Sequence, residues 1–135
     1  MVTQIFVNLP VKDLQKTKEF WSALGFTFNS QFTDDKAACL ILGENMYAML
    51  LVEKFFQDFI TKQIADAATT KEVLLAIQVG NREEVDAMFK KALAAGGSPA
   101  MPPQDHGWMY AHAFTDPDGH HWEPFFMDVA KMPKK

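Results

Sequence analysis

The chain has 135 residues, of which 48% are hydrophobic, and a formal net charge of −4. Its apolar content, with 12 Phe, is sufficient for a buried core and excludes a disordered chain. The acidic balance, with no basic run before the two C-terminal lysines, argues against nucleic acid as a partner. No apolar stretch approaches the roughly 20 residues that span a bilayer, and no secretory signal is evident. We therefore expect a cytoplasmic protein with no membrane partner.

The first part of the chain predicts the order β-α-β-β-β. Residues 5–9 are β-branched and aromatic and predict a strand that Pro10 ends. Asp13 is placed to cap a helix whose apolar positions recur at helical spacing as far as Gly25. Residues 26–32, 37–42 and 46–52 predict three further strands. The single cysteine, Cys39, excludes an intrachain disulfide and is expected as a small core residue.

The middle of the chain predicts a connecting helix followed by a second start of the same pattern. Apolar residues over 53–67 fall on one helical face, which predicts an amphipathic helix. Residues 72–79 predict a strand, and Asn81 with Glu84 forms a capping-box pattern before a helix that ends at Gly96. Residues 98–101 predict a short strand.

The last part predicts a hairpin around the turn Asp116-Pro117-Asp118-Gly119. Its strands are expected over 109–114 and 120–127. Because side chains alternate between strand faces, His121 and Glu123 share one face, while His120 lies on the other and at least one of the two histidines is expected at the surface. A carboxylate among aromatic residues needs a partner, because burying it alone costs several kcal/mol. Glu123 is therefore the first candidate for a functional group.

The repeated pattern predicts an α+β fold of two βαβββ modules. We expect a single domain over residues 1–135, with the first module at 1–53, the connecting helix at 54–70 and the second module at 71–128. Two such modules can pair their sheets into a half-open, curved mixed sheet that has its helices outside and a cavity on the inner face.

Three stretches, in this order, resemble the glyoxalase / bleomycin-resistance / extradiol dioxygenase superfamily, also called the vicinal oxygen chelate superfamily: residues 6–14 (FVNLPVKDL), 20–26 (FWSALGF) and 116–123 (DPDGHHWE). Residues 8–11, 72–75 and 103–110 are similar to a bacterial branch described as predicted lactoylglutathione lyases. The resemblance implies a homodimer and a small-molecule ligand. In the metal enzymes of the family, a divalent ion in the cavity takes ligands from the first, fourth, fifth and eighth strands.

Only one of these metal-ligand positions carries a donor in this chain. Glu123 matches the eighth-strand ligand, whereas Phe6, Met49 and Leu74 occupy the others. Shifting each strand by two residues does not restore a His/Glu set. The family's ligand set is incomplete, although a weakly held divalent metal completed by a histidine stays open as a cofactor.

Two functions follow from the resemblance. The first is a lyase or isomerase, lactoylglutathione lyase-like, that acts on a small carbonyl or thiol-adduct substrate, with Glu123 as general base or sole carboxylate ligand and His106 as second proton carrier. The alternative is a metal-free protein that binds and sequesters a drug or toxin. In either case the residues expected to line the ligand cavity are Asn8, Phe6, Met49, Trp108, Tyr110 and His112. Each of these has a plain structural interpretation as well, as a core, barrel-end or satisfied sheet residue.

Overall fold

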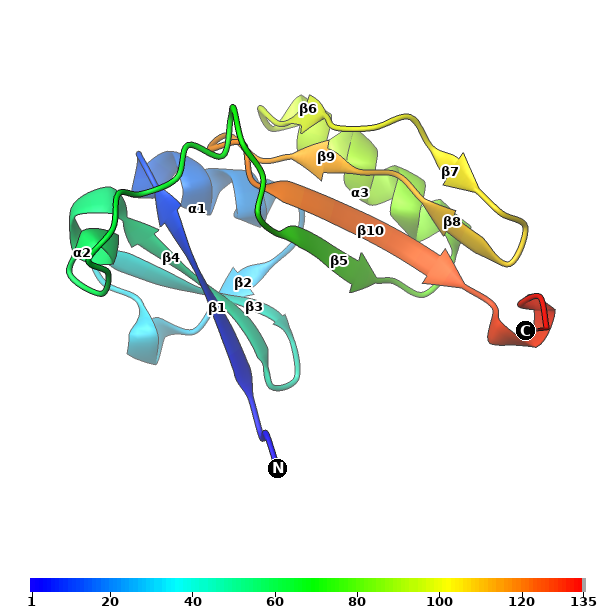
Figure 1. Ribbon diagram of the computed structural model, residues 1–135, viewed down its shortest axis with the longest axis horizontal. Helices are drawn as coiled ribbons and strands as arrows, with labels where there is room; N and C mark the ends of the chain where they lie inside the picture. The colour runs from blue at the N-terminus through cyan, green and yellow to red at the C-terminus, as the bar shows by residue number, and fades with distance from the viewer. Residues whose placement is uncertain (135) are drawn as a thin grey trace. The chain divides into compact units, whose positions relative to one another are not determined.

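The computed structural model describes residues 1–134 and divides into two compact units, one over Met1–Asp66 and one that begins at Ala67 (Figure 1). Each unit packs helices on a mixed sheet, so the predicted α+β class and the two successive modules are confirmed. Among the described residues, no helix combines the length and the apolar character that spanning a lipid bilayer requires.

The first unit follows the predicted β-α-β-β-β order. Its elements are β1 (Ile5–Val11), α1 (Leu14–Ala23), β2 (Thr27–Phe28), β3 (Ala37–Gly43) and β4 (Met46–Val52). The sheet has the order β1-β4-β3-β2, with β1 parallel to β4, and α1 contacts β3 and β4. Asp13 caps α1 by accepting a hydrogen bond from the Lys16 amide at 3.1 Å, and Trp21 and Cys39 are fully buried in the core beneath it.

Three predictions for the first unit need correction. β1 continues through Pro10 to Val11, because β1 is an edge strand and one side of it needs no amide donor. The strand predicted at 26–32 is reduced to β2 and a 3₁₀ turn, Ser30–Phe32, which Asn29 caps by accepting from the Gln31 amide at 2.9 Å. The connecting helix α2 covers only Glu53–Gln57. The β-branched residues that follow at 60, 61 and 64 disfavour its continuation.

In the second unit, the central strand β10 (His121–Met127) organises the sheet. It pairs in parallel with β5 (Leu74–Gln78) and antiparallel with the short strands β8 (Met109–Ala111) and β9 (Phe114–Thr115). The outer strands β6 (Ser98–Pro99) and β7 (Gln104–Asp105) pair with β9 and β8. Helix α3 (Arg82–Ala94) contacts β10, β9 and β8, and Figure 1 shows it lying along one face of the sheet.

The predicted capping box of α3 is confirmed, with one change of partner. The Glu84 amide donates to Asn81 Oδ1 at 2.8 Å, while the Glu84 carboxylate accepts from the Gly80 amide at 2.7 Å.

The strand predicted at 109–114 is interrupted between β8 and β9. The His112 amide donates to the Pro124 carbonyl at 3.2 Å, but proline has no N–H to return the second bond of the pair.

The predicted turn before β10 is confirmed and is held by a buried carboxylate. Asp116 is 5% exposed, and its Oδ1 accepts from the amides of Asp118 and His120, both at 3.0 Å. Its Oδ2 accepts from Trp122 Nε1 at 3.0 Å. Burial raises the pKa of Asp116, and His120 and the Trp122 hydrogen bond act against that rise. His120 itself is buried and His121 half-buried, so the expected surface position for one of them is wrong.

Candidate functional site

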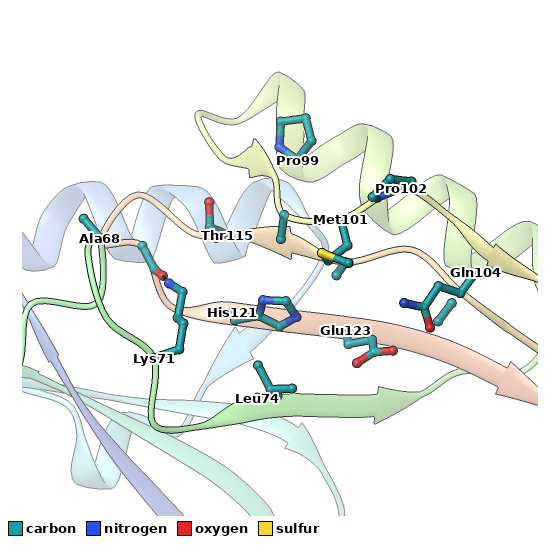
Figure 2. A pocket seen from close by; sticks show the side chains of 14 residues that line it. Ala68, Lys71, Leu74, Pro99, Met101, Pro102, Gln104, Thr115, His121 and Glu123 are labelled. Atoms are coloured by element: carbon teal, nitrogen blue, oxygen red, sulfur yellow. Dashed lines mark hydrogen bonds between the residues drawn. The ribbon is translucent and has the colours of Figure 1, made fainter.

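The second unit contains a cavity of about 780 Å³ on the sheet face opposite α3. Side-chain alternation along β10 turns His121 and Glu123 to this face, whereas Trp122 and Pro124 are buried on the other. The same rule applies to the neighbouring strands: Ala111 is paired with Phe125, and Gln104 with Ala111, so both line the cavity. Figure 2 shows His121 and Glu123 on β10, with Leu74 on one side of this strand and Met101 and Gln104 on the other.

The cavity combines apolar walls with a few polar groups. The walls include Leu74, Met101, Ala111 and Ala113, and the polar side chains include Lys71, Gln104, His121 and Glu123. Within the described residues of the second unit, no hydrogen bond or ion pair engages the Glu123 carboxylate or the Gln104 side-chain amide. An apolar pocket of this size with a few convergent polar groups has the general form of a small-molecule site.

His121 is the titratable neighbour of Glu123. The two side chains lie two residues apart on one strand face, roughly 7 Å from each other along the strand. Burial lowers the pKa of His121; the Glu123 carboxylate raises it, and the Lys71 ammonium lowers it again. The net direction is downward, so the protein environment favours the neutral imidazole, which can accept a proton.

Lys71 marks one end of the cavity. Its Nζ donates hydrogen bonds to the carbonyl oxygens of Ala67 and Gly119, which ties the segment before β5 to the turn before β10. Gly119 has φ +88°, and a Cβ there would lie 3.0 Å from the Ala68 amide nitrogen. Because the two segments approach so closely, this end of the cavity is tightly packed.

Tyr110, expected from the sequence to line the cavity, lies on the other face of the sheet. It is paired with Phe126, so alternation turns its ring towards α3. Its hydroxyl donates to Asp86 Oδ1 at 2.6 Å, and the Arg82 guanidinium lies 4.4 Å from the ring centroid. The hydrogen bond to Asp86 raises the pKa of Tyr110.

His112 lies on the same α3 face as Tyr110. Its ring stacks on Phe89 with the centroids 3.4 Å apart, and its Nδ1 is 3.9 Å from Asp86 Oδ1. Burial lowers the pKa of His112, and Asp86 raises it by a smaller amount. Tyr110 and His112 are therefore partners of the helix and do not line the cavity.

His106 and Trp108 lie in the loop that joins β7 to β8. The His106 amide donates to the Met109 carbonyl at 2.8 Å, which closes the hairpin, and the imidazole is exposed. Asp105 fixes the start of the loop by pairing with Arg82 and by accepting from the Gly107 amide at 2.9 Å. Neither His106 nor Trp108 lines the cavity of the second unit.

The remaining predicted residues belong to the first unit. Asn8 and Met49 are direct neighbours across β1 and β4. The Asn8 side-chain amide donates to the Phe6 carbonyl at 3.2 Å, and the Phe6 ring stacks on Tyr47 with the centroids 4.8 Å apart. The three predicted residues are thus gathered on two adjacent strands.

Four polar residues of the cavity were not among the predicted site residues: Lys71, Gln104, Thr115 and His121. His121 is detectable from the sequence, because alternation places it on the face of Glu123. Gln104 and Lys71 reach the cavity through contacts between segments far apart in the chain, and Lys71 is separated from Gly119 by 48 residues. No local motif signals such a contact.

The donor set of the cavity does not fit the divalent metal that the resemblance implies. Among the described residues that line it, the only His, Asp or Glu side chains are His121 and Glu123. In residues 1–134, no group of three or more His, Cys, Asp or Glu side chains is placed to hold an ion. Protein sites for Zn²⁺ and similar ions normally use three or more protein ligands.

The fold described above occurs in a class of solved structures. A hypothetical protein from S. aureus is 31% identical, with a TM-score of 0.78, over 93% of this chain and 94% of that one. A glyoxalase-related enzyme from Fulvimarina pelagi is 20% identical with a TM-score of 0.78, over 93% and 88%. A glyoxalase/bleomycin resistance protein/dioxygenase family enzyme from Burkholderia phytofirmans is 16% identical with a TM-score of 0.74, over 91% and 97%.

The sequence itself defines the family. The family model described as Glyoxalase/Bleomycin resistance protein/Dioxygenase superfamily matches residues 3–123, and the chain belongs to that superfamily. The family resemblance drawn from the motifs is thereby confirmed. No curated protein matches the chain.

Proposed function

We propose that the cavity of the second unit binds a small organic molecule without a resident divalent metal, with Glu123 as its main polar contact. The observation that carries this proposal is the half-buried Glu123 carboxylate, which has no hydrogen-bond or ionic partner among the described residues of the second unit. Such a group is costly to keep in a partly dry site unless a ligand supplies a hydrogen-bond donor or a cation. Two donors are too few for a stable metal site.

Hexylamine tests the binding proposal, because it offers an ammonium for Glu123 and an alkyl chain for the walls. In chelator-treated protein, amide NMR shifts are expected to report saturable binding at residues lining the cavity. Glu123→Gln should weaken this binding about fivefold, the effect of a half-exposed ion pair. His106→Ala, outside the cavity, should leave it unchanged. Equal affinity in Glu123→Gln would contradict the proposal.

The absence of a resident metal has its own test. Calorimetric titration of the chelator-treated protein with Ni²⁺ or Zn²⁺ should show no binding of one ion per chain. Stoichiometric binding that disappears in Glu123→Gln would instead support a metal enzyme.

A second candidate function is proton transfer, a lyase or isomerase reaction on a small carbonyl or thiol-adduct substrate. It is favoured by the His121–Glu123 pair, in which one face carries a carboxylate and a neutral imidazole. Glu123 would take a proton from the substrate, and His121 would exchange one with its oxygen.

The methylglyoxal–glutathione adduct is a suitable probe for this second function. Turnover in the presence of chelator should be lost in both His121→Gln and Glu123→Gln and retained in His106→Ala. Retained turnover in His121→Gln would exclude this role. The homodimer and the cytoplasmic location remain predictions from the sequence.

A further inference from the structure

The polar side chains of the cavity are arranged in a row along β10. Lys71 lies at the Gly119 end, His121 comes next, and Glu123 follows with Gln104 beside it (Figure 2). Gly119 and Glu123 are four residues apart, so their backbones are separated by at most about 14 Å. Leu74 and Met101 line the same cavity with apolar surface. A cationic end and an anionic end are thus joined by an apolar wall.

The cation at one end is fixed in place. An ammonium group has three N–H donors, and the carbonyls of Ala67 and Gly119 accept two of those of Lys71. Both acceptors are neutral, so the positive charge has no ionic partner among the described residues of the second unit. The third donor is available to a ligand in the cavity, which Lys71 lines.

The anion at the other end is equally uncompensated. Among the described residues of the second unit, no ion pair includes Glu123, and Arg82 is paired with Asp105 on the α3 side of the sheet. A ligand with one charge would satisfy only one end of the cavity. A ligand with opposite charges at its two ends would satisfy both, and an apolar linker would match the walls between them.

We propose that the ligand is a small elongated zwitterion, with its carboxylate held by Lys71 and its ammonium by Glu123. This inference rests on the proposed binding function of the same cavity and specifies the chemical class of its ligand. The neutral His121 imidazole lies between the two ends, where it can hydrogen-bond a polar group of the linker.

The test compares three probes that share a six-carbon chain: 6-aminohexanoate, hexylamine and hexanoate. By NMR titration of the full chain, 6-aminohexanoate should bind at least about fivefold more tightly than either singly charged probe, the effect expected of one further half-exposed ion pair. Lys71→Met should reduce the affinity for 6-aminohexanoate to that for hexylamine, and Lys71→Arg should restore part of the loss. Glu123→Gln should reduce the affinity for 6-aminohexanoate to the affinity for hexanoate.

A series of chain lengths tests the same idea on the unaltered protein, in case Lys71→Met does not fold. Affinity should pass through a maximum among 4-aminobutanoate, 6-aminohexanoate and 8-aminooctanoate, because the distance between the two ends is fixed. If hexylamine binds through Glu123 but no ω-amino acid binds more tightly, the zwitterion inference is overturned and the proposed function stands. If none of the probes binds, both are overturned.

Discussion

On the α3 face of the second sheet, polar side chains satisfy one another, whereas on the cavity face they do not. Tyr110 donates to Asp86 at 2.6 Å, and His112 is stacked on Phe89 within 3.9 Å of the same carboxylate. On the cavity face, Glu123 and Gln104 lack a partner within the described residues of the second unit. Side-chain alternation along the strands turns these two groups of polar residues to opposite faces of the same sheet.

This difference separates residues that stabilise the fold from residues that we propose contact a ligand. A buried or half-buried polar group with partners contributes to stability, and its removal leaves those partners unsatisfied. Replacing a half-exposed polar group that has no partner leaves no other group unsatisfied, so its exchange for a polar residue of similar size is nearly neutral for folding. The following predictions test that distinction, in order of expected effect.

Asp116→Ala should lower the free energy of unfolding by about 3 kcal/mol, because it leaves the buried Trp122 Nε1–H and two amides without their acceptor. Urea unfolding followed by tryptophan fluorescence measures this change. Glu123→Gln is the matched control on the cavity face and should change stability by less than about 0.5 kcal/mol. Equal losses in the two variants would remove the distinction between the faces.

Gly119→Ala should cost about 2 kcal/mol, because it adds a close contact with the Ala68 backbone to the strain of a positive φ. Gly107→Ala isolates the strain, since Gly107 has φ +80° and nothing within 4 Å of an added Cβ. Its expected loss is about 1 kcal/mol. Thermal unfolding of both variants measures the difference in stability. If Gly119→Ala loses no more stability than Gly107→Ala, the contact with the Ala68 backbone makes no contribution to the loss.

Asp86→Ala should cost about 1 kcal/mol, because the Tyr110 hydroxyl loses its acceptor. Asp86→Asn keeps an acceptor oxygen for that hydroxyl and should lose less. Urea unfolding at pH 7.5 distinguishes the two variants. If both leave stability unchanged, the partners on the α3 face do not contribute to folding.

The smallest effect is expected from pH. The pKa values of His121 and His112 are lowered in the folded protein from the ordinary value of 6.5, in both cases mainly by burial. The unfolded chain therefore binds these protons more readily, and the contribution of the two histidines to stability falls as the pH is lowered through 6.5. Glu123 and Lys71 face His121, and Asp86 faces His112.

Unfolding midpoints at pH 7.5 and 5.5 measure this dependence. In His121→Gln the unfolding midpoint should decrease less on acidification than in the unaltered chain, because only the contribution of His112 remains. A midpoint that rises on acidification would mean that protonation of Asp116, whose pKa burial raises in the folded protein, outweighs the effect of the two histidines.

The elements of the fold followed from local patterns. The Asp13 and Asn81 caps, the helices after them and the Asp116 turn are all encoded within a few residues. The helix predicted at 53–67 failed beyond Gln57, because its apolar pattern does not correspond to a buried face, as the 66% exposure of Phe59 shows.

The cavity was only partly accessible from the sequence. Side-chain alternation along the last strand correctly places Glu123 and His121 on one face. If the pairing of His121 with Thr115 is known, the same alternation places His112 and Tyr110 on the opposite face. That register depends on the geometry of the turn. Lys71 lies far from Gly119 in the chain, so its place could not be predicted without the tertiary fold.

Pro124 gives the cavity wall one further property. Because it cannot return the hydrogen bond that its carbonyl accepts from His112, the ladder lacks a rung beside Ala111 and Ala113, which line the cavity. A missing rung weakens the ladder locally, so amide hydrogen–deuterium exchange beside this gap is expected to be faster than in the rest of β10.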